Sequence, residues 1–367
     1  MTQITTTLIL RVSKKKWILA LKNDIDFMEI YMGNVNISIV AQKAQVSQST
    51  VSRVLNNSPL VKETTANKVR QVIKELGYTP NELARGLRSN ETKTVGVIVS
   101  NVLNPFFTSI VRGIEDLANK ANYHIMLCNT DEKAEKEQQY IQALLSKRVD
   151  GLIIASTGTK NDYAALIGNK PVVFVDRKPE GSNKGKFDTV LVHNRDGSRK
   201  AVTQLIEAGY QRIGIITGSN VSTTGYERLS GYEQAFSDKK LPLDRSLIKL
   251  GDFLGHTAYQ NAIDLIKNCS CDAIFAANNM ILLGVLRAIT ELGVNIPEEV
   301  GISAFDDLEW MQFCQPQITA VRQPTYEMGT AAMSLLLDRI AESEEPTREI
   351  NLPVELIVRQ SSQKQIT

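Results

Sequence analysis

At 367 residues, the chain is long for one domain and has the length expected of two or three. Its residues are 43% hydrophobic and 22% charged, as in globular proteins, and no run approaches the roughly 20 apolar residues that cross a bilayer. The four cysteines are few for this length, and Cys269 and Cys271 are too close for a metal knuckle and lack a matching second pair, so reduced thiols are the simplest interpretation. We therefore expect a cytoplasmic protein without export signal, membrane contact, metal or other cofactor.

The net charge of +2 hides an uneven distribution along the chain. Residues 33–93 hold nine Lys and Arg against four Asp and Glu, whereas residues 94–367 carry a net charge of −5. A basic head joined to an acidic body is typical of a protein that binds nucleic acid with one part and senses a ligand with another.

Residues 1–35 form an N-terminal extension to which we assign no function. Met28 and Met32 lie just before the first predicted helix, so the chain could also start there. A disordered segment and a strand-like segment are both compatible with its composition.

Residues 39–56 predict two short helices joined by a tight turn. The apolar positions that would pack them together are Val40 and Ala44 on the first helix, Val46 in the turn, and Val51, Val54 and Leu55 on the second. The second helix opens with short polar residues, of which Ser47 can cap the free N–H groups. This pattern fits a helix-turn-helix that enters the DNA major groove, and an ordinary helical hairpin with a solvated polar face remains the alternative.

A third helix is predicted over 64–76, with Val69, Val72, Ile73 and Leu76 on one face and Gly77 at its end. Residues 81–88 form a short segment that is able to become helical but has little to pack on, so we expect it to fold only against a partner.

From residue 94 onward the pattern alternates between strands and helices. We expect strands at 95–99, 125–127, 151–155, 172–175, 189–192, 212–217, 273–276 and 300–304, separated by helices such as 107–121, 135–147, 198–208 and 259–267. This alternation requires a parallel sheet, and so many strands are better divided between two similar α/β lobes than placed in one sheet. A ligand would bind between the lobes, beyond the carboxyl ends of the strands.

The sequence Val-Ser-Gln-Ser-Thr-Val-Ser-Arg-Val-Leu-Asn at 46–56, followed by Leu-Gly-Tyr-Thr-Pro-Asn at 76–81, resembles the lactose/galactose repressor (LacI/GalR) family. The resemblance continues at 96–99, 104–107, 150–153, 174–177, 228–232, 277–279 and 304–307, and so covers about 36–362. It implies a transcriptional regulator rather than an enzyme, and most simply a repressor of carbohydrate-utilisation genes that a small sugar or sugar derivative releases from its operator.

The resemblance also implies a domain organisation. The parts would be a helix-turn-helix head at 36–80, a hinge helix and linker at 81–93, and an effector-binding core at 94–362. The core would consist of two doubly wound parallel-sheet lobes, like a periplasmic binding protein. The first lobe would span about 94–192 and 324–352 and the second about 193–322 and 353–362. The chain would therefore cross between lobes near Val192, Gln323 and Leu352.

By the same resemblance, the head and hinge would bind a pseudo-palindromic DNA operator as a homodimer. Gln48 and Ser49 would reach base edges, Arg53 would donate to a guanine, and Ser47, Thr50 and Asn56 would bind phosphates. Leu87 would be an apolar wedge in the minor groove. The hinge residues at the DNA would be Asn81, Ala84, Arg85, Leu87 and Arg88. The alternative is that Leu87 packs on the protein's own core.

The effector site would combine aromatic side chains for a sugar ring with polar side chains for its hydroxyl groups. The matching positions are Phe106, Phe107, Asp176, Arg228, Phe253, Asn278, Asp306 and Gln323, with Arg228 as the clamp and Asp306 as the acceptor for a hydroxyl pair. Phe106 and Phe107 follow the first strand, and we expect Phe253 across the cleft. The five polar residues are expected at strand ends or crossovers, namely Asp176, Arg228, Asn278, Asp306 and Gln323. Arg177 beside Asp176 leaves an acidic sugar open as an alternative to a neutral one.

Three positions depart from the family pattern. Gln45 replaces the Gly that is common in the turn and would be strained by about 1 kcal/mol if its φ were positive. Lys62 replaces the usual Ser before the third helix, so Glu63 or Thr64 would have to cap it. Asn278 and Asn279 replace an Asn-Asp pair, which removes one carboxylate near the site.

An enzyme and a sugar-binding sensor without operator binding are the two alternatives to a regulator. The first strand is followed by no glycine-rich phosphate loop, the chain has no Gly-x-Ser-x-Gly motif, and its three histidines are far apart, so we expect no catalytic residues. A cytosolic sugar-binding sensor whose head binds no operator remains the second interpretation.

Overall fold

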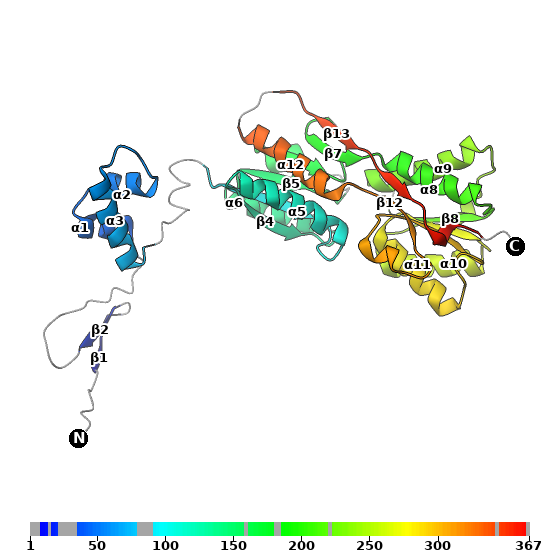
Figure 1. Ribbon diagram of the computed structural model, residues 1–367, viewed down its shortest axis with the longest axis horizontal. Coiled ribbons are helices and arrows are strands. Elements are labelled where there is room, and N and C mark those ends of the chain that lie inside the picture. Colours follow the sequence, from blue (N-terminus) through cyan, green and yellow to red (C-terminus); the bar gives the residue numbers. More distant parts are fainter. Residues whose placement is uncertain are drawn as a thin grey trace, which may run out of the picture. The chain divides into compact units, whose positions relative to one another are not determined.

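The computed structural model describes residues 8–13, 16–20, 35–78, 91–157, 161–179, 185–218, 222–341 and 345–364 (Figure 1). Two compact units make up the chain, Met1–Asn90 and Glu91–Thr367. In the described part, no helix is both long enough and apolar enough to pass through a bilayer. The helix-capable segment predicted at 81–88 lies outside the described residues.

The first unit contains a three-helix head, as predicted. Its helices are α1 (Ile37–Ala44), α2 (Gln48–Leu55) and α3 (Glu63–Leu76), and in the N-terminal extension β1 (Leu8–Ser13) pairs antiparallel with β2 (Lys16–Ala20). The predicted apolar positions form the core of the head, in which Val40, Ala44, Val51 and Val69 are fully buried. Each helix places one apolar face on this small core, so its polar residues remain on the outside.

The ends of the helices follow the local sequence. Ser47 caps α2 by accepting a hydrogen bond from Thr50 N at its Oγ, as predicted. Gln45 ends α1 in the left-handed region with φ 54°, the conformation for which strain was expected. The predicted side-chain cap of α3 was wrong. Lys62 occupies the cap position without a side-chain hydrogen bond, and Glu63 pairs with Arg70 two turns further along the helix instead.

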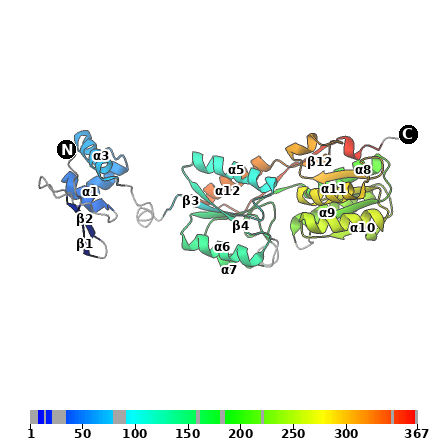
Figure 2. The same ribbon diagram turned by 90° about the horizontal axis from the view of Figure 1, so that it is seen from below.

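The second unit has two α/β lobes, which confirms the expected fold class. The sheet of lobe 1 is entirely parallel. Its order is β13 (Glu349–Leu352), β7 (Asp188–Val192), β6 (Val172–Val175), β5 (Gly151–Ile154), β3 (Thr94–Val99) and β4 (His124–Asn129). Figure 2 shows α5 (Pro105–Lys120) and α12 (Thr325–Ile340) on one face of the sheet, and α6 (Ala134–Ser146) and α7 (Tyr163–Ile167) on the other.

Lobe 2 repeats this arrangement with one antiparallel strand at its edge. Its order is β14 (Glu355–Ile357), β12 (Thr319–Arg322), β11 (Gly301–Phe305), β10 (Ala273–Ala276), β8 (Ile213–Thr217) and β9 (Ile248–Leu250). In Figure 1, α8 (Asn194–Glu207) and α9 (Thr223–Asp238) lie on one side of β8, and α10 (Gly255–Lys267) and α11 (Asn279–Leu292) lie on the other. Three short 3-10 helices, η2 (Arg245–Leu247), η3 (Glu309–Gln312) and η4 (Gln360–Ser362), complete the lobe.

The chain passes between the lobes after β7, after β12 and between β13 and β14. Each lobe is therefore built from segments that are distant in sequence, and the three connections form one hinge region beside the cleft.

All eight predicted strands are present, but four short ones were missed, namely β9, β12, β13 and β14. Each has only three or four residues and includes a charged side chain, so none shows the uninterrupted apolar run of the comparably short β5, β6 and β10. The four predicted helices begin one to four residues earlier than expected.

Close helix crossings explain several glycines. A Cβ on Gly113 of α5 would lie 2.2 Å from the carbonyl oxygen of Tyr326 on α12. A Cβ on Gly231 of α9 would lie 2.2 Å from that of Arg195 on α8. Both distances are far below van der Waals contact, so the backbones approach this closely only because these positions have no side chain.

Candidate functional site

The exposed face of α2 and the turn before it carries six polar side chains that were predicted to bind DNA. They are Ser47, Gln48, Ser49, Thr50, Arg53 and Asn56, of which only Thr50 is half-buried. Ser47 Oγ lies 2.8 Å from Ser49 Oγ and 2.9 Å from Thr50 Oγ1, and Gln48 Nε2 donates to Ser38 Oγ on α1 at 2.9 Å. These hydrogen bonds hold the first turn of α2 in one arrangement at the surface.

Arg53 brings an uncompensated positive charge to this face. It is exposed on the last turn of α2 and pairs with no acidic side chain in the described part of the chain. Two other cations of the head are paired, because Lys43 Nζ lies 3.1 Å from Glu75 and Arg70 Nη1 lies 3.0 Å from Glu63. The arrangement leaves Arg53 available to a base edge or a phosphate.

The other predicted DNA contacts fall on the hinge segment. These contacts lie outside the described residues, namely Asn81, Ala84, Arg85, Leu87 and Arg88. The exposure of Leu87 therefore stays a prediction.

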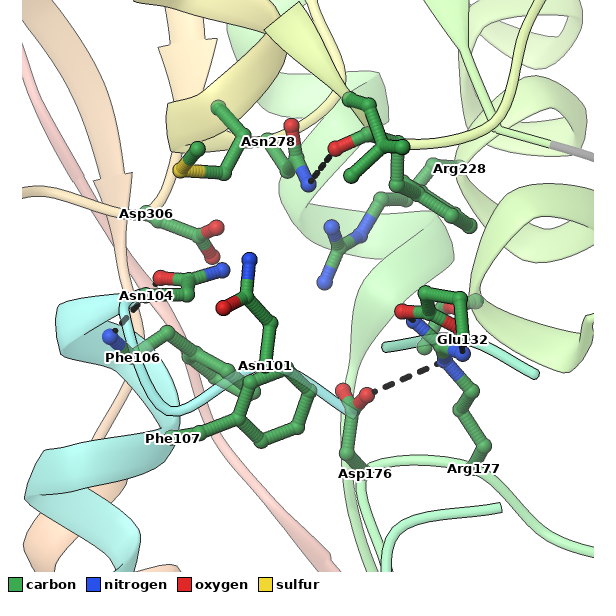
Figure 3. A pocket seen from close by; sticks show the side chains of 14 residues that line it. Asn101, Asn104, Phe106, Phe107, Glu132, Asp176, Arg177, Arg228, Asn278 and Asp306 are labelled. Atoms are coloured by element: carbon green, nitrogen blue, oxygen red, sulfur yellow. Dashed lines mark hydrogen bonds and ion pairs between the residues drawn. The ribbon is translucent and has the colours of Figure 1, made fainter. Parts of the chain in front are cut away.

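A pocket lies between the two lobes, at the carboxyl ends of strands from both sheets (Figure 3). Lobe 1 lines it with Asn101, Asn104, Phe106, Phe107, Glu132, Asp176 and Arg177, and lobe 2 with Thr224, Arg228, Phe253, Leu254, Asn278, Met280 and Asp306. The space between its lining side chains is about 430 Å³ when the part open to solvent is counted, and about 30 Å³ of it is cavity volume that water-sized molecules can occupy. Parallel α/β sheets place ligands at such strand ends because the loops there are free to vary.

An aspartate follows the fourth strand of each lobe. Asp176 comes directly after β6 and Asp306 directly after β11, and both are nearly buried with left-handed backbones, φ 67° and 73°. Asp306 accepts hydrogen bonds from Asn279 N at 3.2 Å and from Gln323 Nε2. Burial raises the pKa of Asp176 to about 6, although the positive charges of Arg177 and Arg228 oppose the shift.

Arg228 reaches the pocket from the middle of α9, so its expected position at a strand end or crossover was wrong. Its Nε donates to Asn194 Oδ1 at 2.8 Å, its Nη1 donates to Ala277 O at 2.6 Å, and its guanidinium lies 3.9 Å from the ring centroid of Phe305. Its Nη2 donates to no described residue, so this nitrogen is available to a ligand oxygen. Burial lowers the pKa of Arg228, against the attraction of Asp306 and Asp176.

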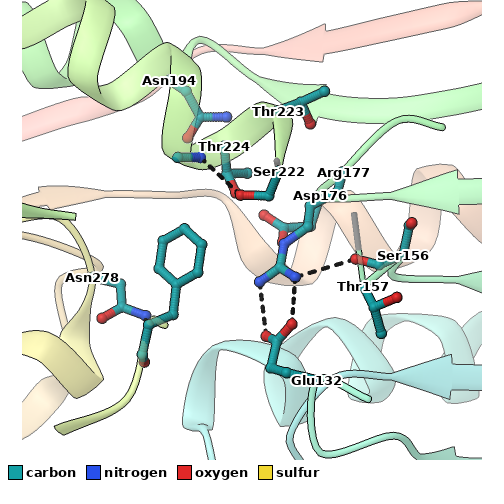
Figure 4. Close-up of polar contacts among 12 residues, drawn as sticks. Glu132, Ser156, Thr157, Asp176, Arg177, Asn194, Ser222, Thr223, Thr224 and Asn278 are labelled. Carbon is teal, nitrogen blue, oxygen red and sulfur yellow. Dashed lines mark hydrogen bonds and ion pairs between the residues drawn. The ribbon is translucent and has the colours of Figure 1, made fainter. Parts of the chain in front are cut away.

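Arg177 is held by a carboxylate that the sequence analysis did not identify. Its Nη1 and Nη2 donate to the two carboxylate oxygens of Glu132 at 2.7 and 2.9 Å (Figure 4). Nη1 also donates to Ser156 O at 3.2 Å, and Nε lies 3.3 Å from Asp176 Oδ2. Burial alone would lower the pKa of Arg177, but the charge and hydrogen bonds of Glu132 raise it.

Three aromatic rings supply the apolar surface of the pocket. Phe106 and Phe107 pack edge to face with centroids 5.0 Å apart at the start of α5. Phe253 of lobe 2 lies over Gly218, where a Cβ would come within 2.0 Å of the ring. The guanidinium of Arg177 lies 5.1 Å from the centroid of Phe253, so this pair spans the two lobes.

Seven of the eight predicted effector residues line this pocket. The exception is Gln323, which was placed in the site but instead donates to Asp306 from behind it. Asn278 lines the pocket, yet its Oδ1 caps α11 by accepting from Ile281 N at 2.7 Å. Its Nδ2 donates to Phe253 O at 3.4 Å.

Six lining residues were not predicted from the sequence, namely Asn101, Asn104, Glu132, Thr224, Leu254 and Met280. Asn104 could have been found, because an Asn before Pro105 marks the start of a helix at the first strand end. Glu132 carries no such signal. It lies in a turn after β4 with φ 58°, and only the folded chain brings it to Arg177.

Comparison with protein families finds two matches. Residues 36–81 match the family described as bacterial regulatory proteins, lacI family, and residues 202–362 match the periplasmic binding protein-like domain. The first match spans the three helices of the head and the second lies in the two-lobed core.

Individual proteins extend these matches over most of the chain. A probable HTH-type transcriptional regulator EndR of Paenibacillus polymyxa is 39% identical over 85% of this chain and 92% of its own length. A lac repressor dimer bound to operator and the anti-inducer ONPF has a TM-score of 0.78 at 26% identity, over 89% of this chain and 99% of its own. A complex of the transcriptional regulator CelR with cellobiose has a TM-score of 0.68 at 30% identity, with the same coverage.

Proposed function

The chain belongs to the LacI family of transcriptional repressors with a DNA-binding helix-turn-helix, and from this premise we propose that it represses carbohydrate-utilisation genes under the control of a sugar. The observation that carries the proposal is the pocket between the lobes. There Asp176, Arg228 and Asp306 converge with three phenylalanine rings on one small space. Directional hydrogen-bonding groups beside flat apolar faces suit a polyhydroxylated ring.

Two solved relatives support this class of effector. CelR is described as a complex with cellobiose, and the lac repressor as bound to the anti-inducer ONPF. We propose the corresponding role for this chain's pocket, with Arg228 Nη2 donating to a ring or hydroxyl oxygen and Asp306 accepting from a hydroxyl pair.

Binding would act on the operator through the lobes. A ligand that holds the two lobes closed favours one arrangement of the core, and its differential affinity for the two arrangements sets the shift in DNA binding. We propose release of the operator on sugar binding. The reciprocal prediction is that operator DNA weakens the binding of the sugar by the same factor.

The DNA-binding roles rest on the geometry of α2. Gln48, Ser49 and Arg53 are proposed to reach base edges in the major groove, with Ser47, Thr50 and Asn56 at phosphates. The roles of Asn81, Ala84, Arg85, Leu87 and Arg88 in the minor groove complete the proposal for the hinge.

We propose a homodimer that forms through the exposed edges of the two sheets. The edge strand of lobe 1, β4, exposes Met126 and Leu127, and the edge strand of lobe 2, β9, exposes Leu250. In each sheet this edge strand is the one farthest from β13 or β14, the strands next to the connections between the lobes. The edges formed by β4 and β9 can therefore form one continuous face. A second copy would cover this face, and the paired heads would read a pseudo-palindrome.

A mobility-shift titration on the gene's own upstream region tests the proposal. We expect Arg53→Ala to weaken specific binding about tenfold to a hundredfold, because a bidentate contact to guanine contributes 1–3 kcal/mol. The matched control is Arg70→Ala, which removes a paired arginine from α3. Binding should also weaken steeply with salt, through counterion release. Sugar binding without any operator shift at low salt would favour the alternative, a sensor that does not bind DNA.

A thermal-shift screen against sugars tests the effector. At a hundredfold excess over its dissociation constant, a true effector adds about 2.7 kcal/mol to the free energy of unfolding. Arg228→Lys should lose most of this gain, since the shorter ammonium cannot reproduce the fixed planar geometry.

A further inference from the structure

The charges around the pocket define which sugars it can accept. We propose that the effector is an uncharged polyhydroxylated compound, and that Glu132 excludes anionic ones such as sugar phosphates and sugar acids. This inference rests on the proposed carbohydrate function and adds the chemical class of the ligand and the residue that selects it.

Arg177 is the side chain that an anionic sugar would be expected to seek, but it is already occupied. Glu132 accepts from both terminal nitrogens of Arg177 at 2.7 and 2.9 Å, in the bidentate geometry that a ligand carboxylate or phosphate would use. Ser156 O takes a further hydrogen bond, and Phe253 covers the guanidinium at 5.1 Å. Glu132 thus stands where the anionic group of a ligand would have to bind.

The whole pocket carries more negative than positive charge. Its lining includes three carboxylates, Glu132, Asp176 and Asp306, against two guanidinium groups, Arg177 and Arg228. Arg228 makes no ion pair with a described carboxylate at 4 Å or less, but an anion approaching it would also face Asp176 and Asp306, whose charges already act on it. In a buried site such repulsion is weakly screened, so an anion would be disfavoured.

Glu132 is held in place by its own loop. Glu132 and the preceding Asp131 both have left-handed backbones, φ 58° and 52°, and Asp131 pairs with Lys136 on α6. The Glu132 side chain is 21% exposed, compared with 5% for Arg177, so it covers the arginine at the pocket edge. The pair is therefore part of the pocket wall rather than a surface contact.

The test compares wild type with Glu132→Gln, which keeps the side-chain shape and removes its charge. Thermal shift and calorimetry would use neutral pentoses, hexoses and disaccharides together with the corresponding sugar phosphates and uronic acids. Wild type should respond to a neutral compound and to none of the anions. In Glu132→Gln the ratio of anionic to neutral affinity should rise about tenfold or more, because one repulsive charge is gone. Glu135→Gln, an exposed glutamate three residues away, is the matched control and should behave as wild type.

Inorganic phosphate, titrated at constant ionic strength, tests the charge effect without any sugar. It should raise the melting temperature of Glu132→Gln but not that of wild type or Glu135→Gln. A wild type that binds an anionic sugar more tightly than its neutral parent would overturn the proposal, and so would a Glu132→Gln variant with unchanged discrimination and no phosphate response. If no sugar binds but phosphate stabilises only Glu132→Gln, the carbohydrate function fails while the role of Glu132 in excluding anions stands.

Discussion

The two lobes of the core have the same strand order but different chemistry at the pocket. Counted from the edge strands β13 and β14, the third strand is β6 in lobe 1 and β11 in lobe 2. Asp176 and Asp306 follow these two strands at equivalent positions. In lobe 1 the aspartate lies beside a charged pair, Arg177 and Glu132. In lobe 2 it accepts from uncharged donors, the amide of Gln323 and the backbone N–H of Asn279. The topology therefore places an acid at each strand end, and the neighbouring side chains decide what each acid can do.

The largest expected effect is a loss of stability at the close helix crossing of each lobe, and it tests whether the two crossings are equally tight. Gly113 is the ninth residue of α5 and Gly231 the ninth of α9, and each faces a backbone carbonyl 2.2 Å from the position of a Cβ. Alanine at either position should lower the free energy of unfolding by about 3 kcal/mol, because the helices must separate. Urea denaturation measures the loss.

Gly251→Ala is the control, since its Cβ would make an ordinary contact at 3.5 Å. If alanine were tolerated at one of the two helix crossings and not at the other, the equivalence of the lobes in packing would fail.

The next effect is a pH dependence of the free energy of unfolding that comes from Asp176. The pKa of Asp176 is about 6 in the folded chain, above its ordinary value of 3.8, so the folded state binds the proton more tightly than the unfolded state. Its contribution to stability is full below pH 4 and is lost as the pH rises through 6, by at most about 3 kcal/mol. Asp176→Asn should remove this slope from a series of denaturation midpoints.

In Asp306→Asn the slope between pH 4 and 6 should persist, because Asp176 is still present. An Asp176→Asn variant that kept the full slope would show that another group titrates in this range.

A smaller effect concerns the contact between the lobes. Asn279 Nδ2 donates at 2.7 Å to Asn104 Oδ1, which already accepts from Phe106 N. Asn279→Asp would place a carboxylate against this oxygen and close to Asp306, and we expect a loss of about 2 kcal/mol. Asn279→Ala, which removes the hydrogen bond without adding a charge, should lose about 1 kcal/mol. Equal stability of Asn279→Asp and wild type in urea would contradict this orientation of the two amides.

The smallest expected effect compares two equivalent positions in the head, the residues that end α1 and α3. Gln45 and Gly77 both end a helix with left-handed φ, 54° and 58°. Gln45→Gly should stabilise the head by about 0.5–1 kcal/mol and Gly77→Ala should destabilise it by a similar amount, because only glycine adopts this conformation without strain. Hydrogen exchange of the amides of α1 and α3 in the full chain measures both. The two substitutions should change the stability of the head in opposite directions, and changes in the same direction would contradict this prediction.

Most of the architecture was predictable because apolar periodicity reports burial directly. The head helices and the eight predicted strands follow from this signal. The strands β9, β12, β13 and β14 were missed, since a charged residue shortens or interrupts the apolar run in each of them. The side-chain cap expected for α3 was wrong because a weak local preference does not require a hydrogen bond.

For the pocket, the sequence by itself determined the type of side chain at the strand ends, since Asp176, Asn278 and Asp306 directly follow apolar segments. Only the tertiary structure decided their partners. Glu132 and Arg177 are 45 residues apart, and Asn104 and Asn279 are 175 residues apart, yet each pair is joined by hydrogen bonds. Local sequence sets backbone conformation and burial, but a contact between polar groups depends on which loops the sheets bring together. The charge balance of the pocket is therefore a property of the fold and not of any one motif.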